Sequence, residues 1–299
     1  MGIIDIEDLK KYFPVGRGAF SRGEWLRAVD GVSFSVQEGK VFSLVGESGC
    51  GKSTVARLVL KLMRPTGGEV LFRGSKVFEL SGDSLKAFRK SVQIIFQDPF
   101  ASLNPRMTVF DTLSEPLKIH VLAKKADYKD RVIALLKSVG MQEDILNRYP
   151  HEFSGGQRQR ICIARALAVS PEVIVADEPL SALDVSIQAQ ILNLLMDLRD
   201  QLGLTYLFIS HDLRIVKHIS DRIAVMYMGK IVEMAFGEDL FRRPLHHYTQ
   251  LLLKAIPKLD PAQRGEEVLA KEEPRILPSQ KGCLFQPRCP HSQEKCQSE

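Results

Sequence analysis

The chain has 299 residues, 44% of them hydrophobic, which indicates a globular protein of one large domain or two smaller ones rather than a disordered chain. The net charge is +5, but the basic residues are scattered, so nucleic acid and anionic lipid are not favoured as partners. Apolar runs all fall well short of the roughly 18 residues of a membrane span, and the N-terminus is acidic where a signal peptide is basic, so we expect a cytosolic or peripheral protein.

The N-terminal part of the chain is expected to form a small antiparallel β layer. Two stretches of alternating polarity, IIDIEDLKKYF and AVDGVSFSVQEG, flank a polar excursion at residues 15–25 that is rich in Gly and Arg. Such alternation predicts strands that are buried on one face.

A phosphate-binding loop follows this layer. The apolar run at residues 41–45 predicts a buried strand, and a Gly-rich turn then leads into a helix, as phosphate-binding loops require. The glycines let the backbone N–H groups approach an anion, Lys52 would reach the β- and γ-phosphates, and the Ser53 hydroxyl would bind Mg²⁺. The expected nucleotide contacts are Gly46, Glu47, Ser48, Gly49, Cys50, Gly51, Lys52, Ser53 and Thr54.

The remainder of the chain predicts an α/β sheet with a helical insertion. Strand-like runs lie at residues 69–72 and 91–96, and helical patterns at 130–139 and 160–167. Short apolar runs at 173–176 and 205–209 are typical of a parallel sheet, and the helix expected between them has an apolar face of Ile187, Ile191, Leu194, Leu198 and Leu202.

Polar residues at three strand ends are candidates for chemistry. Asp177 ends an apolar strand and could bind Mg²⁺, and Glu178 follows it as a candidate base for the attacking water. Gln97 could touch Mg²⁺ or that water, and His211 could bind the γ-phosphate or hold Glu178 in place. Each of these residues, taken alone, is equally typical of an ordinary solvated strand end.

A capped helix start completes the candidate site. Ser154 and Gln157 have the spacing of a capping box, and Gly155 and Gly156 between them leave room for a phosphate on the helix N-terminus. The simpler interpretation is a well-capped helix.

Taken together, these motifs resemble those of the ATP-binding cassette (ABC) family. The matches are GESGCGKST to the Walker A loop, Gln97 to the Q-loop, FSGGQ to the signature, VIVADEP to Walker B, SALD to the D-loop and His211 to the switch histidine. The resemblance implies ATP and Mg²⁺ as cofactors, with Ser53, Gln97 and Asp177 around the metal. It also implies catalytic roles for Lys52, Glu178 and His211, a nucleotide contact from Asp184, and adenine stacking on Phe13 or, less favoured, Tyr12.

The family resemblance also implies a domain organisation and partners. It predicts a RecA-like core with the β layer at residues 1–97 and 171–235, a helical signature subdomain at 98–170, and a C-terminal extension at 236–299. Two such ATPases sandwich ATP head to tail, each signature helix completing the other's site. The chain is therefore expected to pair with a second ATPase, favoured to be a paralogue, at the cytoplasmic face of a membrane.

Several stretches resemble more specifically the ATPases of bacterial oligopeptide and dipeptide importers. These are FQDPFASLNPRMTV after Gln97, RRPLHHYTQLLLKAIP near the C-terminus, and the final Cys-containing stretch. Two permease subunits and an extracytoplasmic binding protein are the implied partners. Phe100, Leu103, Met107 and Val109 are the expected permease-facing surface. The alternatives are an importer of nickel or another solute and, less favoured, a soluble ABC ATPase.

The C-terminal cysteines form the last candidate site. Cys283, Cys289 and Cys296 resemble a terminal motif that in some relatives binds an iron–sulfur cluster, although a 4Fe–4S cluster normally takes four thiolates. With His291 they could instead form a Cys₃His zinc site, or the thiols could carry no metal. Such a cluster would lie apart from the ATP motifs and would serve to fix the tail.

Overall fold

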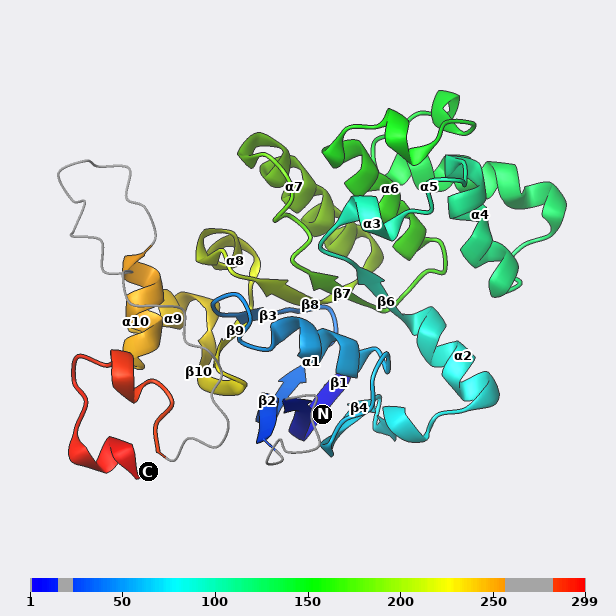
Figure 1. Ribbon diagram of the computed structural model, residues 1–299. Helices are drawn as coiled ribbons and strands as arrows, with labels where there is room; N and C mark the ends of the chain where they lie inside the picture. The colour runs from blue at the N-terminus through cyan, green and yellow to red at the C-terminus, as the bar shows by residue number, and fades with distance from the viewer. Residues whose placement is uncertain (1, 16–23, 256–281, 299) are drawn as a thin grey trace. The chain divides into compact units, whose positions relative to one another are not determined.

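The computed structural model describes residues 2–15, 24–255 and 282–298 (Figure 1). It has the α/β architecture that the sequence predicts. Two compact units are present: unit 1 comprises Met1–Gln37, Val41–Phe78 and Ser210–Glu299, and unit 2 comprises Glu38–Lys40 and Glu79–Ile209. The two compact units divide the chain differently from the expected core, signature subdomain and C-terminal extension. That functional division remains a prediction.

Unit 1 contains the expected antiparallel β layer. The sheet has the order β2-β1-β4-β5, in which β1 (Ile4–Val15) pairs with β2 (Glu24–Val36) and β4 (Gly67–Phe72), and β4 pairs with β5 (Ser75–Lys76). Ile4, Ile6 and Leu9 of β1 are buried, while Glu7 and Asp8 between them are exposed. This alternation is why the first two strands could be recognised from the sequence.

A second strand group in unit 1 supports the phosphate loop. Strand β3 (Val41–Val45) runs parallel to β9 (Arg222–Tyr227), which pairs antiparallel with β10 (Lys230–Phe236). All five residues of β3 are buried, as the apolar run predicts. The strands β9 and β10 were not predicted from the sequence. The α-helices that the structure describes in this unit are α1 (Lys52–Val59), α8 (Leu213–Ile219), α9 (Gly237–Arg242) and α10 (His247–Lys254).

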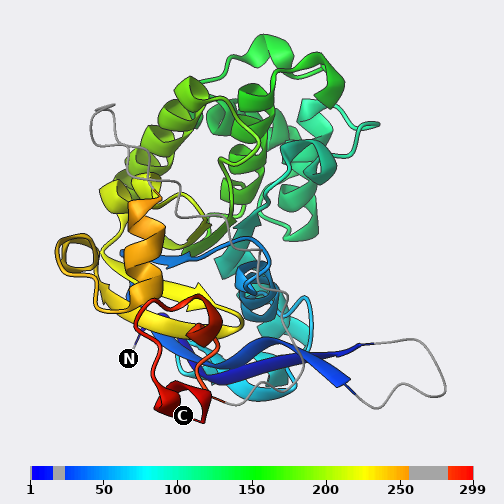
Figure 2. The same ribbon diagram turned by 60° about the vertical axis from the view of Figure 1, so that its left-hand side comes forward.

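The C-terminal part of unit 1 ends in a short segment, Gly282–Ser298, which we call the tail segment. It contains two single-turn helices at Gln286–Arg288 and Glu294–Gln297, and the Cys283 N–H donates to the Cys296 carbonyl over 2.9 Å. Figures 1 and 2 both show the tail segment, coloured red, beside α10, coloured orange. The segment is thus closed on itself and lies against the folded unit.

Unit 2 is built on three parallel strands, β6 (Val92–Ile95), β7 (Val173–Asp177) and β8 (Thr205–Ser210). The helices of this unit include α2 (Gly82–Ser91), α3 (Pro99–Ser102), α4 (Val109–Ile119), α5 (Tyr128–Ser138), α6 (Gly155–Leu167) and α7 (Val185–Leu202). The strands and the helices α5, α6 and α7 confirm the predicted ones. The predicted buried face of α7 is partly wrong, because Leu195 is buried while Leu202 is 56% exposed at the end of the helix.

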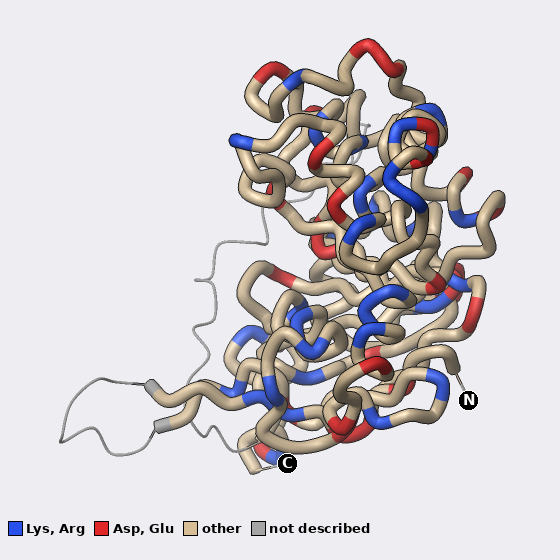
Figure 3. The backbone as a smooth tube through the Cα atoms, turned by 90° about the vertical axis from the view of Figure 1, so that its right-hand side faces the viewer, with Lys and Arg blue, Asp and Glu red and all other residues tan. Residues whose placement is uncertain are grey.

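The described residues show the scattered charges that the sequence analysis expects, and their helices are short or polar. Figure 3 shows basic and acidic residues interspersed along the backbone. Across residues 2–15, 24–255 and 282–298, no helix has the length and apolar character that a membrane span requires.

Candidate functional site

The phosphate loop connects β3 to α1, and the side chain of Lys52 occupies it. Lys52 is 3% exposed, and its Nζ donates to the carbonyl oxygens of Gly46 at 2.8 Å and Glu47 at 2.9 Å. The ammonium group therefore lies within the curve of the loop, at the N-terminus of a helix. An anion that enters this loop would meet a full positive charge and the positive end of the helix dipole.

The backbone of the loop is fixed by the neighbouring strands. Gly51 has φ +112°, and a Cβ at this position would overlap the carbonyl oxygen of Ala28 on β2. The Gly229 N–H donates to the Cys50 carbonyl over 2.9 Å, which ties the loop to the turn between β9 and β10. The Cys50 side chain is 5% exposed, and burial raises the pKa of its thiol. The Cys50 thiol also lies inside the loop, where it accepts a 3.9 Å contact from Lys52 Nζ.

Gln97 and Glu178 lie together in unit 2. The Gln97 side-chain amide donates to the Glu178 carboxylate over 3.0 Å. This contact is a consequence of topology, because the two residues follow β6 and β7, which are adjacent and parallel, and the carboxyl ends of such strands share one edge. Asp177, immediately before Glu178, is 6% exposed.

The backbone at Glu178 has a conformation that is uncommon for a residue with a side chain. Its φ is +47°, in the left-handed region, and its N–H donates to the Ile209 carbonyl of β8 over 3.0 Å. Such a conformation costs about 1 kcal/mol or more and persists where the surrounding structure fixes it. The fold thus fixes the backbone of Glu178, from which the carboxylate accepts the Gln97 hydrogen bond.

The signature helix α6 has the predicted capping box. The Ser154 N–H donates to Gln157 Oε1 over 3.0 Å, and Ser154 Oγ accepts from the Gln157 N–H over 3.4 Å. A Cβ on Gly156 would lie 2.6 Å from Ile187 Cγ2 on α7. Gly156 is therefore needed for packing between these helices, a role that the sequence analysis missed. Asp184 directly precedes α7 and is exposed.

The aromatic candidates for adenine stacking differ in their surroundings. The Tyr12 hydroxyl donates to Asp30 Oδ1 over 2.5 Å, and burial together with this hydrogen bond raises the pKa of Tyr12 to about 12. Phe13 is half-buried, with Lys11 Nζ 5.2 Å from its ring centre. Because Tyr12 is committed to Asp30, Phe13 remains the preferred candidate. The roles of Phe13, Asp184, His211, and of Ser53 and Asp177 at Mg²⁺ stay predictions.

The segment after Gln97 corrects part of the expected permease-facing surface. Phe100 is 59% exposed, and the Arg158 guanidinium lies over its ring, 4.5 Å from the centre of the Phe100 ring. Leu103 and Val109, by contrast, are 3% and 1% exposed, and Met107 is half-buried. Leu103 and Val109 belong to the core of unit 2 and cannot face a partner.

The tail segment does not support the expected metal site. All three cysteines lie within described residues as free thiols, yet no group of three or more His, Cys, Asp or Glu there could hold a metal ion. His291 stacks on His247 of α10, with 4.3 Å between ring centres. The geometry therefore fits neither the iron–sulfur cluster nor the zinc site proposed from Cys283, Cys289 and Cys296.

Sequence reasoning missed two residues that contact the phosphate loop. The Tyr248 hydroxyl accepts a 2.9 Å hydrogen bond from the Glu47 N–H, and the Arg288 guanidinium binds the Glu47 carboxylate. No signal in the sequence could have paired them, because 201 and 241 residues separate these partners from Glu47. We expected the tail to lie apart from the ATP motifs. Arg288 of the tail instead contacts Glu47 of the phosphate loop.

The loop fits a nucleoside triphosphate with its magnesium ion. The buried ammonium of Lys52, the close approach required at Gly51 and the α1 N-terminus form a cradle for phosphate oxygens. The hydroxyl of Ser53, at the start of α1, is an oxygen donor of the kind that Mg²⁺ prefers.

Comparison with known proteins assigns both parts of the chain. A family model described as "ABC transporter" matches residues 29–181, and one described as "Oligopeptide/dipeptide transporter, C-terminal region" matches residues 232–296. The chain is 50% identical to the oligopeptide transport ATP-binding protein AppF of Bacillus subtilis, over 99% of this chain and 92% of that protein. It is 54% identical to OppF of the same organism, over 92% and 88% respectively.

A solved structure agrees with the fold. The dimeric structure of the ATP-binding cassette MJ0796, in a post-hydrolysis state bound to ADP and Pi, aligns with a TM-score of 0.68 and 30% identity. The alignment covers 78% of this chain and 98% of that one.

Proposed function

This chain belongs to the ABC transporter family as an ATP-hydrolysing subunit, and we propose that it drives the import of oligopeptides or dipeptides. The observation that carries the peptide assignment is the C-terminal match at residues 232–296, which is to a region named for oligopeptide and dipeptide transporters. The named activities of AppF and OppF support the same substrate class.

Each residue at the ATP site has a proposed role. Lys52 neutralises the β- and γ-phosphates, Ser53, Gln97 and Asp177 surround Mg²⁺, and Glu178 takes the proton of the attacking water. Bound Mg²⁺ supplies charge neutralisation on the phosphate oxygens. The hydrogen bond from Gln97 to Glu178 supports this arrangement, because it orients the carboxylate that would act as the base.

The proposed transporter contains further subunits. We infer a second ATPase subunit, favoured to be a paralogue, whose nucleotide is contacted by Ser154 and Gly155 at the start of α6. Two permease subunits and an extracytoplasmic binding protein would receive the motion of the pair at the cytoplasmic face of the membrane. The exposed Phe100 ring supports a docking surface just after Gln97.

A second candidate is an importer of nickel or another solute that uses the same type of cassette. Substrate choice in such transporters depends mainly on the binding protein and permeases. The C-terminal match to the oligopeptide/dipeptide region favours peptides.

The test is transport by the complete complex. The subunit should be purified from membranes with its co-purifying permeases and binding protein, reconstituted into liposomes, and assayed for ATP-dependent uptake of labelled di- and oligopeptides and of labelled nickel. Peptide uptake alone supports the proposal. Uptake of nickel without peptide would instead identify the second candidate, and the absence of co-purifying permeases would favour a soluble ATPase.

A further inference from the structure

The tail segment contacts the phosphate loop through one bidentate ion pair. Arg288 Nη1 lies 2.7 Å from Glu47 Oε2, and Arg288 Nη2 lies 2.9 Å from Glu47 Oε1. The two side chains are 11% and 23% exposed. A bidentate pair that is this shielded from water is stronger and more geometrically defined than an exposed ion pair.

An aromatic cluster holds Arg288 in place. Phe285, three residues before it, is 2% exposed and lies 5.4 Å from the Tyr227 ring and 5.6 Å from the Tyr248 ring, between centres. The Arg288 guanidinium lies 5.9 Å from the centre of the Tyr227 ring. Figure 2 shows the tail segment against the yellow strands and α10 that carry these tyrosines. The apolar cluster therefore fixes the position from which Arg288 reaches the loop.

The same cluster also holds the backbone of Glu47. The Tyr248 ring lies tilted against the Tyr227 ring, with 4.5 Å between ring centres, and the Tyr248 hydroxyl accepts a 2.9 Å hydrogen bond from the Glu47 N–H. Glu47 is thus held at its backbone by α10 and at its carboxylate by the tail segment. Glu47 directly follows Gly46, whose carbonyl oxygen accepts a hydrogen bond from the Lys52 ammonium. The contacts of Tyr248 and Arg288 with Glu47 therefore act on the part of the loop that surrounds this ammonium.

The charge of Glu47 is unfavourable for the expected ligand. A carboxylate in a loop that receives a triphosphate repels it, unless a cation compensates that charge at short range. Arg288 is such a cation, because its guanidinium binds the Glu47 carboxylate in a bidentate ion pair.

We propose that Arg288 is a positioning residue for nucleotide binding, which neutralises Glu47 and fixes the phosphate loop in its binding conformation. The inference rests on the proposed ATP site, and it adds a role for the tail segment. ATP affinity would then depend on whether the tail is docked.

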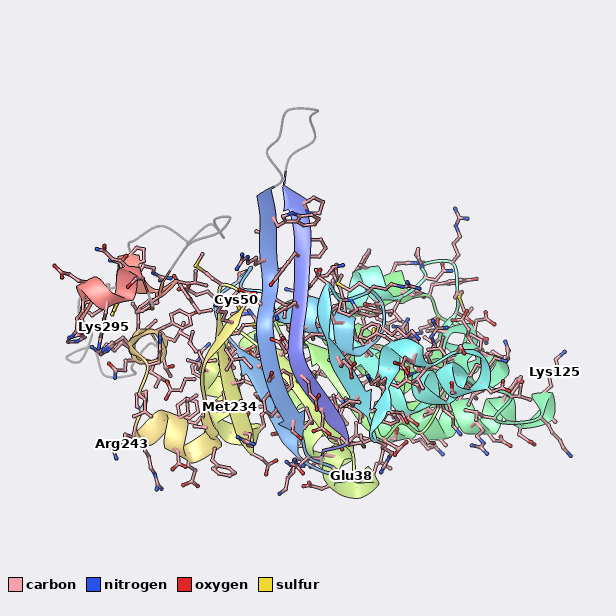
Figure 4. The ribbon with its side chains drawn as sticks, turned by 90° about the horizontal axis from the view of Figure 1, so that it is seen from below. Glu38, Cys50, Lys125, Met234, Arg243 and Lys295 are labelled. Atoms are coloured by element: carbon pink, nitrogen blue, oxygen red, sulfur yellow. The ribbon has the colours of Figure 1, made fainter. Side chains whose placement is uncertain are left out.

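The experiment measures ATP affinity with a fluorescent ATP analogue on the full chain. The variants are Arg288→Ala, Glu47→Gln, the double variant, Lys52→Ala, and Lys295→Ala as a matched control. Lys295 is an exposed cation of the same segment, and Figure 4 shows it at the outer edge of the tail, away from Cys50 of the loop. Thermal unfolding of each variant checks that the fold is retained.

We expect Arg288→Ala to weaken ATP binding about tenfold, because an uncompensated carboxylate stays in the loop. Adding Glu47→Gln should restore most of this loss, since the charge that required Arg288 is gone, and the loss should shrink at high salt. Lys295→Ala should bind as the wild type does. Rescue by Glu47→Gln is the decisive readout, because a purely structural role of Arg288 would not be rescued by it.

Two outcomes would overturn the inference. One is unchanged affinity in Arg288→Ala while Lys52→Ala loses binding; the other is a loss in Arg288→Ala that Glu47→Gln leaves uncorrected. If Lys52→Ala itself binds ATP normally, the proposed ATP site is wrong, and this inference fails with it.

Discussion

The side-chain amide of Gln97 donates a 3.0 Å hydrogen bond to the carboxylate of Glu178. The two residues follow adjacent parallel strands, so the sheet itself brings the Q-loop and Walker B positions together.

Replacing Glu178 with Gln should separate ATP binding from hydrolysis. The amide keeps the shape of the side chain and an oxygen that can accept from Gln97, but it cannot take a proton from water. We expect ATP affinity within about twofold of the wild type and a hydrolysis rate at least about 100-fold lower in single-turnover assays. Hydrolysis at the wild-type rate in the complete transporter would remove Glu178 from its proposed role.

Lys52→Ala should act on binding instead. Loss of a buried ammonium that faces the phosphates should weaken ATP affinity by about tenfold or more. Lys86→Ala is the matched control, since the Lys86 side chain is 78% exposed on α2. Equal affinities of the two variants, measured by titration with a fluorescent ATP analogue, would argue against the loop assignment.

Two glycines of the phosphate loop should differ in their tolerance of Ala. Both have positive φ, which costs an Ala residue about 1 kcal/mol. A Cβ at Gly49 meets nothing within 4 Å, whereas one at Gly51 overlaps the Ala28 carbonyl. We therefore expect Gly51→Ala to lower the free energy of unfolding by at least about 3 kcal/mol and to abolish ATP binding.

Gly49→Ala should remain folded and bind ATP with a modest loss. Urea unfolding and nucleotide titration would measure both effects. A variant at Gly51 as stable as the one at Gly49 would show that the loop backbone can shift away from β2.

Phe100 and Leu103 provide a matched test of permease docking. Phe100→Glu changes an exposed ring and should alter the free energy of unfolding by no more than about 1 kcal/mol. It should leave the ATPase activity of the isolated subunit intact but reduce transport by the reconstituted complex.

Leu103→Asp places a charge in the core of unit 2 and should cost about 3 kcal/mol or more. It should therefore lower both activities together. If Phe100→Glu also lowers the ATPase activity of the isolated subunit and transport by the complex in equal proportion, its effect is on folding rather than on docking.

The parts of the fold that the sequence predicts are those with a strong local pattern. The buried runs of β3, β7 and β8, the alternating β1 and the capped α6 were recognised because each residue's environment follows from its near neighbours. Gln97 and Glu178 were placed at strand ends for the same reason.

Other features depend on contacts distant in sequence. Leu103 lies in a Pro-containing segment without periodicity, so the pattern cannot tell a buried side chain from an exposed one. Arg288 meets Glu47 across 241 residues, and neither residue type nor spacing indicates that contact. Strand β9, by contrast, could have been found from the sequence, since RIAVMY contains an apolar run of strand length that is almost entirely buried in the fold.

Docking of the tail segment should depend on Phe285 and not on a bound metal. The segment is held by the buried Phe285 ring, by the pair between Arg288 and Glu47 and by the stacking of His291 on His247, and its described cysteines form no metal-binding group. Treatment with iron and zinc chelators should therefore leave the hydrogen-exchange protection of residues 283–289 and the ATP affinity unchanged. Phe285→Ala removes the buried ring at a cost of about 3 kcal/mol, so it should raise exchange in this stretch by more than about tenfold. Phe236→Ala is the control, because that ring is 64% exposed, and it should leave the tail protected. Loss of protection on chelation would mean that a metal holds the segment and that the cysteines rearrange to bind it.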